Sequence, residues 1–259
     1  MNTADAAATG TREKGIEAAI TLMRRSGLSG AGINEIVRES GAPKGSVYYF
    51  FPKGKQQIVK EGLTQYSERV VAFIDSALSG KRKPGAKVKA LFNAFAERIE
   101  LGEFRHSCPV GTVCLDLDSE LEGLRFVVAA AFDQYVMAIE AHFPFQDRRQ
   151  AKSFAGLLLT AIEGAYIRGR ADRSSKPFRE AGAWLAELAE RAIATTMAAE
   201  IASIDAEIGW VTKTLQSPFD SSNARRRFSS INGPRTKPRI SGAGSKSSLS
   251  RMKPTTANR

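Results

Sequence analysis

Residues 32–51 read GINEIVRESGAPKGSVYYFF, and this stretch decides the fold of the N-terminal part of the chain. Its first half predicts a short helix that ends at Gly41, because apolar residues recur there at helical spacing. Proline is tolerated in the first turn of a helix, so a second short helix is predicted to begin at Pro43. The inward-facing residues of the two helices are Ile33, Ile36, Val37, Val47 and Phe51. Two such helices joined by a tight turn at 40–42 outline a helix-turn-helix module, whose second helix lies in the major groove of DNA.

A longer helix is predicted to precede this motif. Apolar residues recur three and four positions apart at Ile16, Ala19, Ile20 and Met23. Thr11 is the expected N-cap of this helix, and Gly27 is its expected end.

The rest of the chain to about residue 215 also has helical periodicity, and no stretch alternates as a strand would. The predicted fold class is therefore all-α. We expect a helix-turn-helix DNA-binding domain at 9–69, a second helical domain at 70–198, a possible helical extension at 199–215 and a basic disordered tail at 216–259.

Composition limits the class of protein. The 259 residues carry a net charge of +11, but 216–259 alone contain ten Lys or Arg and one acid, Asp220. This segment is also rich in Ser and poor in large apolar residues, which predicts disorder. The sequence has no long apolar run, which argues against a membrane span and against a secretory signal. Two cysteines are too few for a disulfide framework and indicate a reducing, cytoplasmic location.

The exposed positions of the motif suit DNA. Lys44 supplies a cation for phosphate, Gly45 allows close backbone approach, and Ser46 can bond a phosphate or a base edge. Tyr48 and Tyr49 each combine an apolar ring with a hydroxyl group. The full set of predicted DNA-binding residues is Ser29, Pro43, Lys44, Gly45, Ser46, Tyr48, Tyr49 and Lys55. On spacing alone, the alternative is a helical corner with both tyrosines packed in the core.

The run SGAPKGSVYYFFPKGK at 40–55 strongly resembles the DNA-binding module of TetR-family transcriptional regulators. Two further elements resemble the LmrA/YxaF-like branch of that family. These are the FPKGK entry to the next helix at 51–55 and a CPVG element at 108–111. The resemblance covers about residues 9–198, and it implies that the helical domain at 70–198 is the effector-binding and dimerisation domain.

This resemblance implies a homodimeric, ligand-responsive repressor that binds a near-palindromic operator. It implies that two long helices, at about 147–173 and 177–198, pair with those of a second subunit. The expected dimerisation residues are Phe154, Leu158, Ile162, Gly164, Leu185 and Leu188. The chain departs from the family by carrying Ala31-Gly32 where Thr is usual, which removes the usual phosphate contact there and leaves Ser29 as the candidate substitute. It also carries Phe50 where His is common.

Aromatic residues are frequent in 84–145, which predicts a pocket for a planar hydrophobic effector. The candidates are Phe92, Phe95, Phe104, Cys108, Phe126 and Tyr135. The alternative for each is a place in the ordinary core of a helical bundle. Arg105 and His106 beside Cys108 leave a thiol redox switch open as a further hypothesis, against a simple packing role.

Other classes of protein receive little support. The spacing of Cys and His matches no zinc pattern, no catalytic or phosphate-binding motif occurs, and no cofactor is expected. A nonspecific architectural DNA binder that uses the basic tail is the remaining alternative to a sequence-specific regulator.

Overall fold

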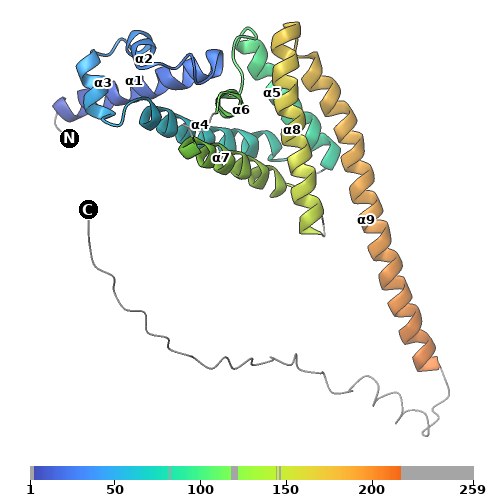
Figure 1. Cartoon of the computed structure of the whole chain (residues 1–259). Helices are drawn as coiled ribbons and strands as arrows, with labels where there is room; N and C mark the ends of the chain where they lie inside the picture. Colours follow the sequence, from blue (N-terminus) through green and yellow to red (C-terminus); the bar gives the residue numbers. More distant parts are fainter. Residues whose placement is uncertain (1–2, 82, 118–121, 144, 146, 217–259) are drawn as a thin grey trace, which may run out of the picture. The chain divides into compact units, whose positions relative to one another are not determined.

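The computed structural model describes residues 3–81, 83–117, 122–143, 145 and 147–216 of the chain. These residues form helices and no strand, so the all-α prediction is confirmed (Figure 1). None of the described helices is both long enough and apolar enough to cross a membrane.

The helices follow one another as the periodicity predicts, with some differences at their ends. Their bounds are α1 (Thr3–Ser26), α2 (Ile33–Ser40), α3 (Lys44–Phe50), α4 (Lys55–Leu78), α5 (Pro84–Leu101), α6 (Pro109–Leu115), α7 (Glu122–Glu140), α8 (Arg148–Asp172) and α9 (Lys176–Gln216). The prediction of Thr11 as the N-cap of the first helix is wrong, because α1 begins at Thr3. Pro43 is the N-cap of α3 and precedes its first turn.

Helix α1 packs against α2, α3 and α4 to form a small N-terminal head. Its core includes Met23, Ile36, Val47 and Phe51, each at most 2% exposed. The crossing of α1 and α4 is close at Gly62, where an added Cβ would lie 3.2 Å from the Met23 Cε atom. A larger side chain at this position would therefore require the Met23 and Ile20 side chains to shift.

The remaining helices form the body, in which α7 packs against α4 and α8 (Figure 1). Helix α4 belongs to both parts, because its first turns pack against α1 and its later residues line the body core. The predicted boundary at 69–70 falls inside this uninterrupted helix. Helix α4 is therefore one continuous element shared by the head and the body.

The last helix extends well beyond the helix predicted at 177–198. The possible extension at 199–215 is helical, and α9 runs without a break to Gln216. The chain divides into two compact units, Met1–Ser203 and Ile204–Arg259, and the described part of the second unit is the end of this helix. The predicted disordered tail lies, from residue 217 onward, outside the described residues.

Candidate nucleic-acid interface and internal cavity

The turn between α2 and α3 is fixed by one serine and one glycine. The Ser40 hydroxyl accepts a hydrogen bond from the Ala42 backbone N–H at 3.2 Å and donates one to the Val37 carbonyl at 3.2 Å. Gly41 ends α2 in the left-handed conformation, with φ of 65°. These contacts set the direction in which α3 leaves the turn.

Helix α3 has a buried face and an exposed face. Val47 is 2% exposed, whereas Tyr48 and Tyr49 are 49% and 77% exposed. The Lys44 ammonium lies 6.0 Å from the centre of the Tyr48 ring, within the range of a cation–π contact. The alternative that both tyrosines pack in the core is wrong, because an aromatic and cationic surface faces outward.

The other predicted DNA contacts differ in their accessibility. Pro43 and Gly45 are exposed beside Lys44, and Ser46 is half-buried. Lys55 is half-buried in the first turn of α4, where free backbone N–H groups favour phosphate. Six of the eight predicted residues thus lie on α3 or its N-cap, and Lys55 begins the next helix.

Ser29 lies apart from α3, in the turn that follows α1. Its hydroxyl donates a hydrogen bond to the Ser26 carbonyl at 3.3 Å, and its backbone N–H donates to the Asp116 carboxylate at 3.0 Å. The hydroxyl oxygen still has acceptor capacity, but phosphate oxygens require a donor. Ser29 is exposed, and its role as a phosphate contact stays a prediction.

Sequence reasoning missed a residue that holds the start of α4. The Gln57 side chain accepts a hydrogen bond from the Lys53 N–H at 3.1 Å and donates one to the Phe50 carbonyl at 3.4 Å. Gln57 thereby connects the end of α3 to Lys53, in the turn that precedes Lys55 and α4. A polar residue in the first turn after the FPKGK element was the available signal.

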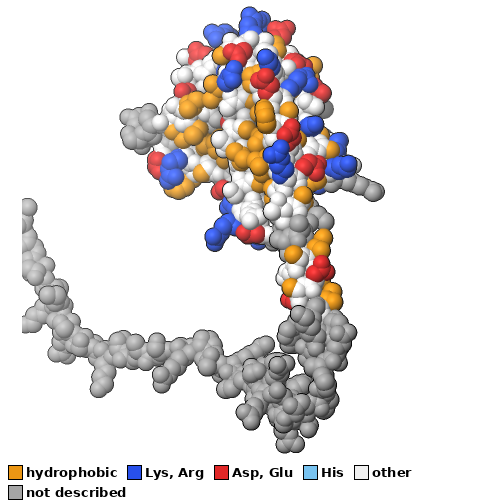
Figure 2. All heavy atoms as spheres, turned by 90° about the vertical axis from the view of Figure 1, so that its right-hand side faces the viewer, with side chains coloured by type: hydrophobic (Ala, Val, Ile, Leu, Met, Phe, Trp, Pro, Cys, Tyr) orange, Lys and Arg blue, Asp and Glu red, His pale blue; other side chains and the backbone are white. Residues whose placement is uncertain are grey.

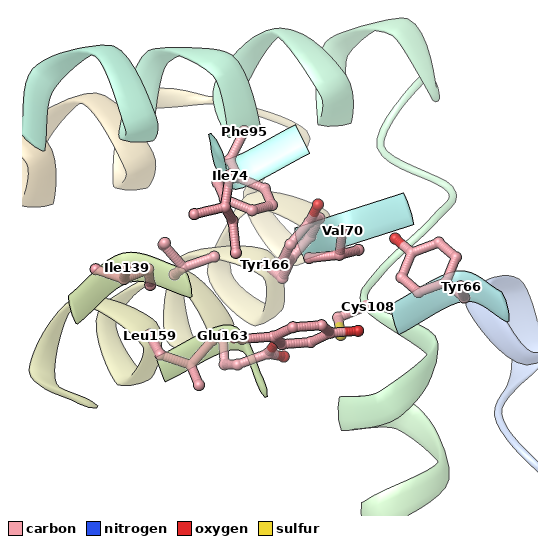
Figure 3. Close-up of a pocket in the computed structure, with 11 residues that line it drawn as sticks. Tyr66, Val70, Ile74, Phe95, Cys108, Ile139, Leu159, Glu163 and Tyr166 are labelled. Atoms are coloured by element: carbon pink, nitrogen blue, oxygen red, sulfur yellow. The ribbon is translucent and has the colours of Figure 1, made fainter. Parts of the chain in front are cut away.

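An internal cavity lies in the body, between α4, α5, α7 and α8 and beside the N-cap of α6. It brings together three predicted effector residues, Phe95, Cys108 and Tyr135. Its volume is about 10 Å³, enough for about one water molecule. The other residues that line it are Tyr66, Val70, Ile74, Ile139, Leu159, Ile162, Glu163 and Tyr166 (Figure 3).

Three predicted effector residues do not line this cavity. Phe92 is fully buried against α9, where an added Cβ at Gly182 would lie 2.6 Å from the Phe92 Cβ atom. Phe104 is half-buried in the turn after α5, with φ of 60°. Phe126 is 63% exposed on α7. Phe92 is thus a packing residue, as the ordinary-core alternative states.

The cavity holds one carboxyl group among aromatic and aliphatic side chains. Burial raises the pKa of Glu163 to about 7, although a hydrogen bond from the Cys108 thiol opposes this effect. Burial also raises the pKa of Cys108 well above its usual value, so the thiol stays protonated. The thiolate that a redox switch at Cys108 requires is therefore disfavoured, and Arg105 and His106 do not stabilise it.

Helix α6 links the cavity to the head. Its N-cap is Cys108 in the cavity, while the Thr112 hydroxyl donates a 2.8 Å hydrogen bond to the Met23 carbonyl near the end of α1. The Ser107 N–H donates a hydrogen bond to the Arg24 carbonyl at 2.9 Å, and the Asp116 carboxylate after α6 accepts the hydrogen bond from the Ser29 N–H. One short helix therefore contacts both the cavity and the turn between α1 and α2.

Helices α8 and α9 present an apolar surface. Leu157, Ile167, Trp184 and Leu188 are each at least 44% exposed. A shallow depression between the helices contains Gly164, and an added Cβ there would meet nothing within 4 Å. Figure 2 shows hydrophobic side chains gathered on the side of the molecule where α9 lies.

The predicted dimerisation residues divide between this surface and the core. Leu188 is exposed, Gly164 lines the depression and Leu185 is half-buried. In contrast, Phe154, Leu158 and Ile162 are at most 7% exposed and pack inside their own protomer. Those three side chains are not available to a second copy in this conformation.

The described residues contain no group of three or more His, Cys, Asp or Glu that could hold a metal ion. The polar groups that line the cavity with Glu163 are a thiol and three phenols, and the Glu163 Oε2 atom lies close to Gly111, 2.5 Å from where an added Cβ would be.

Two protein-family models match the chain. The model described as bacterial regulatory proteins of the tetR family matches residues 16–61, which contain the helix-turn-helix motif. The model described as the C-terminal domain of LmrA/YxaF-like transcriptional regulators matches residues 84–184, which contain most of the cavity lining.

Individual relatives agree with these models. The HTH-type transcriptional regulator LmrA of Bacillus subtilis (strain 168) is 27% identical over 183 residues, which cover 70% of this chain and 97% of that protein. The uncharacterized HTH-type transcriptional regulator Rv0196 of Mycobacterium tuberculosis (strain ATCC 25618 / H37Rv) is 29% identical over 177 residues, which cover 65% and 88%.

Solved structures share the fold. The regulatory protein TetR from Rhodobacter sphaeroides superposes with a TM-score of 0.61 at 18% identity, covering 68% of this chain and 96% of that one. A TetR transcriptional regulator from Chloroflexus aurantiacus J-10-fl gives a TM-score of 0.59 at 24% identity, covering 70% and 94%.

Proposed function

The chain is a DNA-binding transcriptional regulator of the TetR family with an LmrA/YxaF-like C-terminal domain, and from this premise we propose that it is a homodimeric repressor released from its operator by a small hydrophobic effector. The relatives are named as transcriptional regulators and not as enzymes. A regulator of this kind acts on chromosomal DNA, so we place it in the cytoplasm.

The exposed face of α3 is the single observation that carries the proposal. Tyr49 is 77% exposed beside Lys44 on the second helix of a helix-turn-helix motif, so its ring and hydroxyl are accessible to a partner. Its ring suits a thymine methyl group and its hydroxyl a phosphate, while Lys44 suits a phosphate.

The surface of α8 and α9 supports the dimer. Trp184 and Leu188 expose large apolar area on α9, and the depression at Gly164 is open to a side chain of another copy. A twofold dimer sets its two recognition helices about one DNA turn apart, roughly 34–36 Å, which makes the operator a near-palindrome.

The small volume of the cavity supports control by an effector, because a ligand can enter only if the protein rearranges. Because the volume is only about 10 Å³, a ligand larger than water must displace the side chains that line it. Tyr66, Val70 and Ile74 belong to α4, and Cys108 caps α6, so the displaced elements are those that touch the head. Effector binding then shifts the population away from the DNA-spaced dimer.

A selection of duplexes from a random pool, followed by gel-shift titration with the full-length chain, tests this function. We expect one near-palindromic site to be enriched. Tyr49→Ala should weaken binding to that site by roughly 1–3 kcal/mol. Lys44→Ala should reduce the slope of log affinity against log salt by about 1.

The control is Phe126→Ala, which removes an aromatic side chain of similar exposure from α7 and should leave operator affinity unchanged. Unchanged affinity in both head variants, or no enrichment of any sequence, would contradict the proposed function. Folding of each variant is checked by circular dichroism.

A further inference from the structure

The Glu163 carboxylate is the only carboxylate that lines the cavity, and none of the ion pairs among the described residues includes it. Its side-chain partner is the Cys108 thiol, a weak hydrogen-bond donor. Figure 3 shows Glu163 and Cys108 beside the same space as Tyr66 and Tyr166. An ionised carboxylate in such surroundings lacks a compensating positive charge.

The nearby guanidinium groups do not supply that charge. Arg24 and Arg98 lie over the Tyr66 ring, at 5.8 Å and 5.7 Å from its centre. Neither contributes to the pKa of Glu163, which is set by burial and by Cys108. The two arginines act on Tyr66 and leave the carboxylate without a cationic partner.

The walls of the cavity suit a cation that also has an apolar body. Four aromatic rings line it, those of Tyr66, Phe95, Tyr135 and Tyr166, and the faces of such rings attract positive charge. The aliphatic remainder of the lining favours hydrocarbon. An anionic ligand would be repelled by Glu163, and a neutral one would leave the carboxylate uncompensated.

We propose that this cavity is the site of a hydrophobic organic cation, whose positively charged nitrogen lies against the Glu163 carboxylate and whose apolar body lies among the aromatic rings. The proposal rests on the proposed function, because it specifies the chemical class of the effector. In this proposal Glu163 favours a ligand with a positive charge, and the aromatic rings favour a ligand with an apolar body.

Two compounds of nearly the same shape provide the test. In (3-hydroxyphenyl)trimethylammonium a nitrogen carries the charge, and 3-tert-butylphenol has a neutral carbon in its place. In isothermal titration of the full-length chain, the ammonium compound should bind at least roughly tenfold more tightly than the phenol. Glu163→Gln keeps the side-chain shape and should bring the two affinities close to parity.

The control variant is Glu187→Gln, which removes an exposed carboxylate of α9 and should keep the preference for the cation. Equal affinities in the unmodified chain, an unchanged preference in Glu163→Gln, or binding of neither compound would each overturn the proposal. Gel shifts without either compound are run on the same samples. Intact operator recognition together with no cation preference rejects the effector class alone, whereas lost operator recognition rejects the proposed function.

A second measurement needs no variant. Affinity for the ammonium compound should fall as the pH drops below about 7, because Glu163 becomes neutral, while affinity for the phenol should stay constant. The other ionisable groups facing Glu163 keep their state in this range, since the pKa values of Cys108, Tyr66, Tyr135 and Tyr166 are raised and arginines remain charged. A constant affinity for the cation between pH 5.5 and about 8 would also reject the proposal.

Discussion

Glu163 illustrates how one buried carboxyl group can act against the stability of the unliganded protein. Burial raises its pKa from 4.5 to about 7, so the folded protein holds a proton that the unfolded chain releases between these values. A proton bound more tightly by the folded state stabilises it at low pH, and this contribution is lost as the pH rises through about 7. At pH 8 the folded protein contains an ionised, poorly compensated carboxylate.

Glu163→Gln should therefore stabilise the protein at alkaline pH. We expect the free energy of unfolding to rise by about 1–3 kcal/mol at pH 8, an amount bounded by the difference between the two pKa values. The gain should shrink steadily toward pH 5. Urea unfolding of both proteins at several pH values measures it, and a gain that does not depend on pH would contradict the assigned cause.

The single residues differ in how well sequence predicts them. The spacing of α3 predicts the exposure of Tyr48 and Tyr49 once Val47 is taken as buried, because successive helical residues are rotated by a constant angle. The same rule places Glu163 on a helix but cannot show what faces it. Its neighbours Tyr66 and Cys108 lie on other elements, far along the chain, so no local spacing relates them.

Helix α3 is a seven-residue element whose stability comes from its contacts with the head, since so short a helix is not stable alone. Two glycines near it have different roles. Gly41 has a positive φ of 65°, which other residues adopt at a cost. Gly45 lies inside the helix, and an added Cβ would meet nothing within 4 Å of the protein.

The two glycines give a matched pair of substitutions. Gly45→Ala should stabilise the protein by about 0.5–1 kcal/mol, because alanine favours the helix, yet weaken operator binding, because the new methyl group lies where DNA approaches. Gly41→Ala should destabilise it by about 1 kcal/mol through backbone strain. Thermal unfolding and gel shifts measure both effects. Unchanged operator affinity in Gly45→Ala would remove Gly45 from the interface.

The helices themselves could largely be predicted because helical periodicity is a local property. Their ends were less predictable, as the start of α1 at Thr3 and the unbroken α9 to Gln216 demonstrate. The lining of the cavity was predictable only in part. Phe95 and Phe126 look alike in sequence, but one faces the cavity and the other faces solvent, because packing between helices decides it.

At the scale of the whole molecule, the apolar surface of α8 and α9 is the interface of the proposed dimer. Exposed tryptophan and leucine side chains on one face of a protomer are typical of an interface. Because these residues contribute little to the protomer's own core, charges can be introduced there without unfolding it. Dimerisation and folding can thus be tested separately.

Trp184→Glu combined with Leu188→Glu should convert the proposed dimer to a monomer with unchanged helicity. Buried like charges and unpaired carboxylates at the interface oppose association. Sedimentation measures the oligomeric state, and gel shifts should show loss of tight operator binding, since one recognition helix contacts only half a site. Leu101→Glu, at a leucine that is 87% exposed elsewhere, is the control and should stay dimeric. A variant that remains dimeric would place the interface on another surface.

The basic segment 217–259 separates a sequence-specific regulator from a nonspecific DNA binder. It carries ten Lys or Arg against one acid, so its contribution to DNA affinity is electrostatic and weakens with salt. A chain ending at Gln216 should lose affinity for random duplex at low salt but keep its preference for the selected operator, because the preference comes from α3. Competition gel shifts at two salt concentrations measure the ratio of the two affinities. If the ratio fell to unity in the shortened chain, the specificity would reside in the basic segment and not in the helix-turn-helix motif.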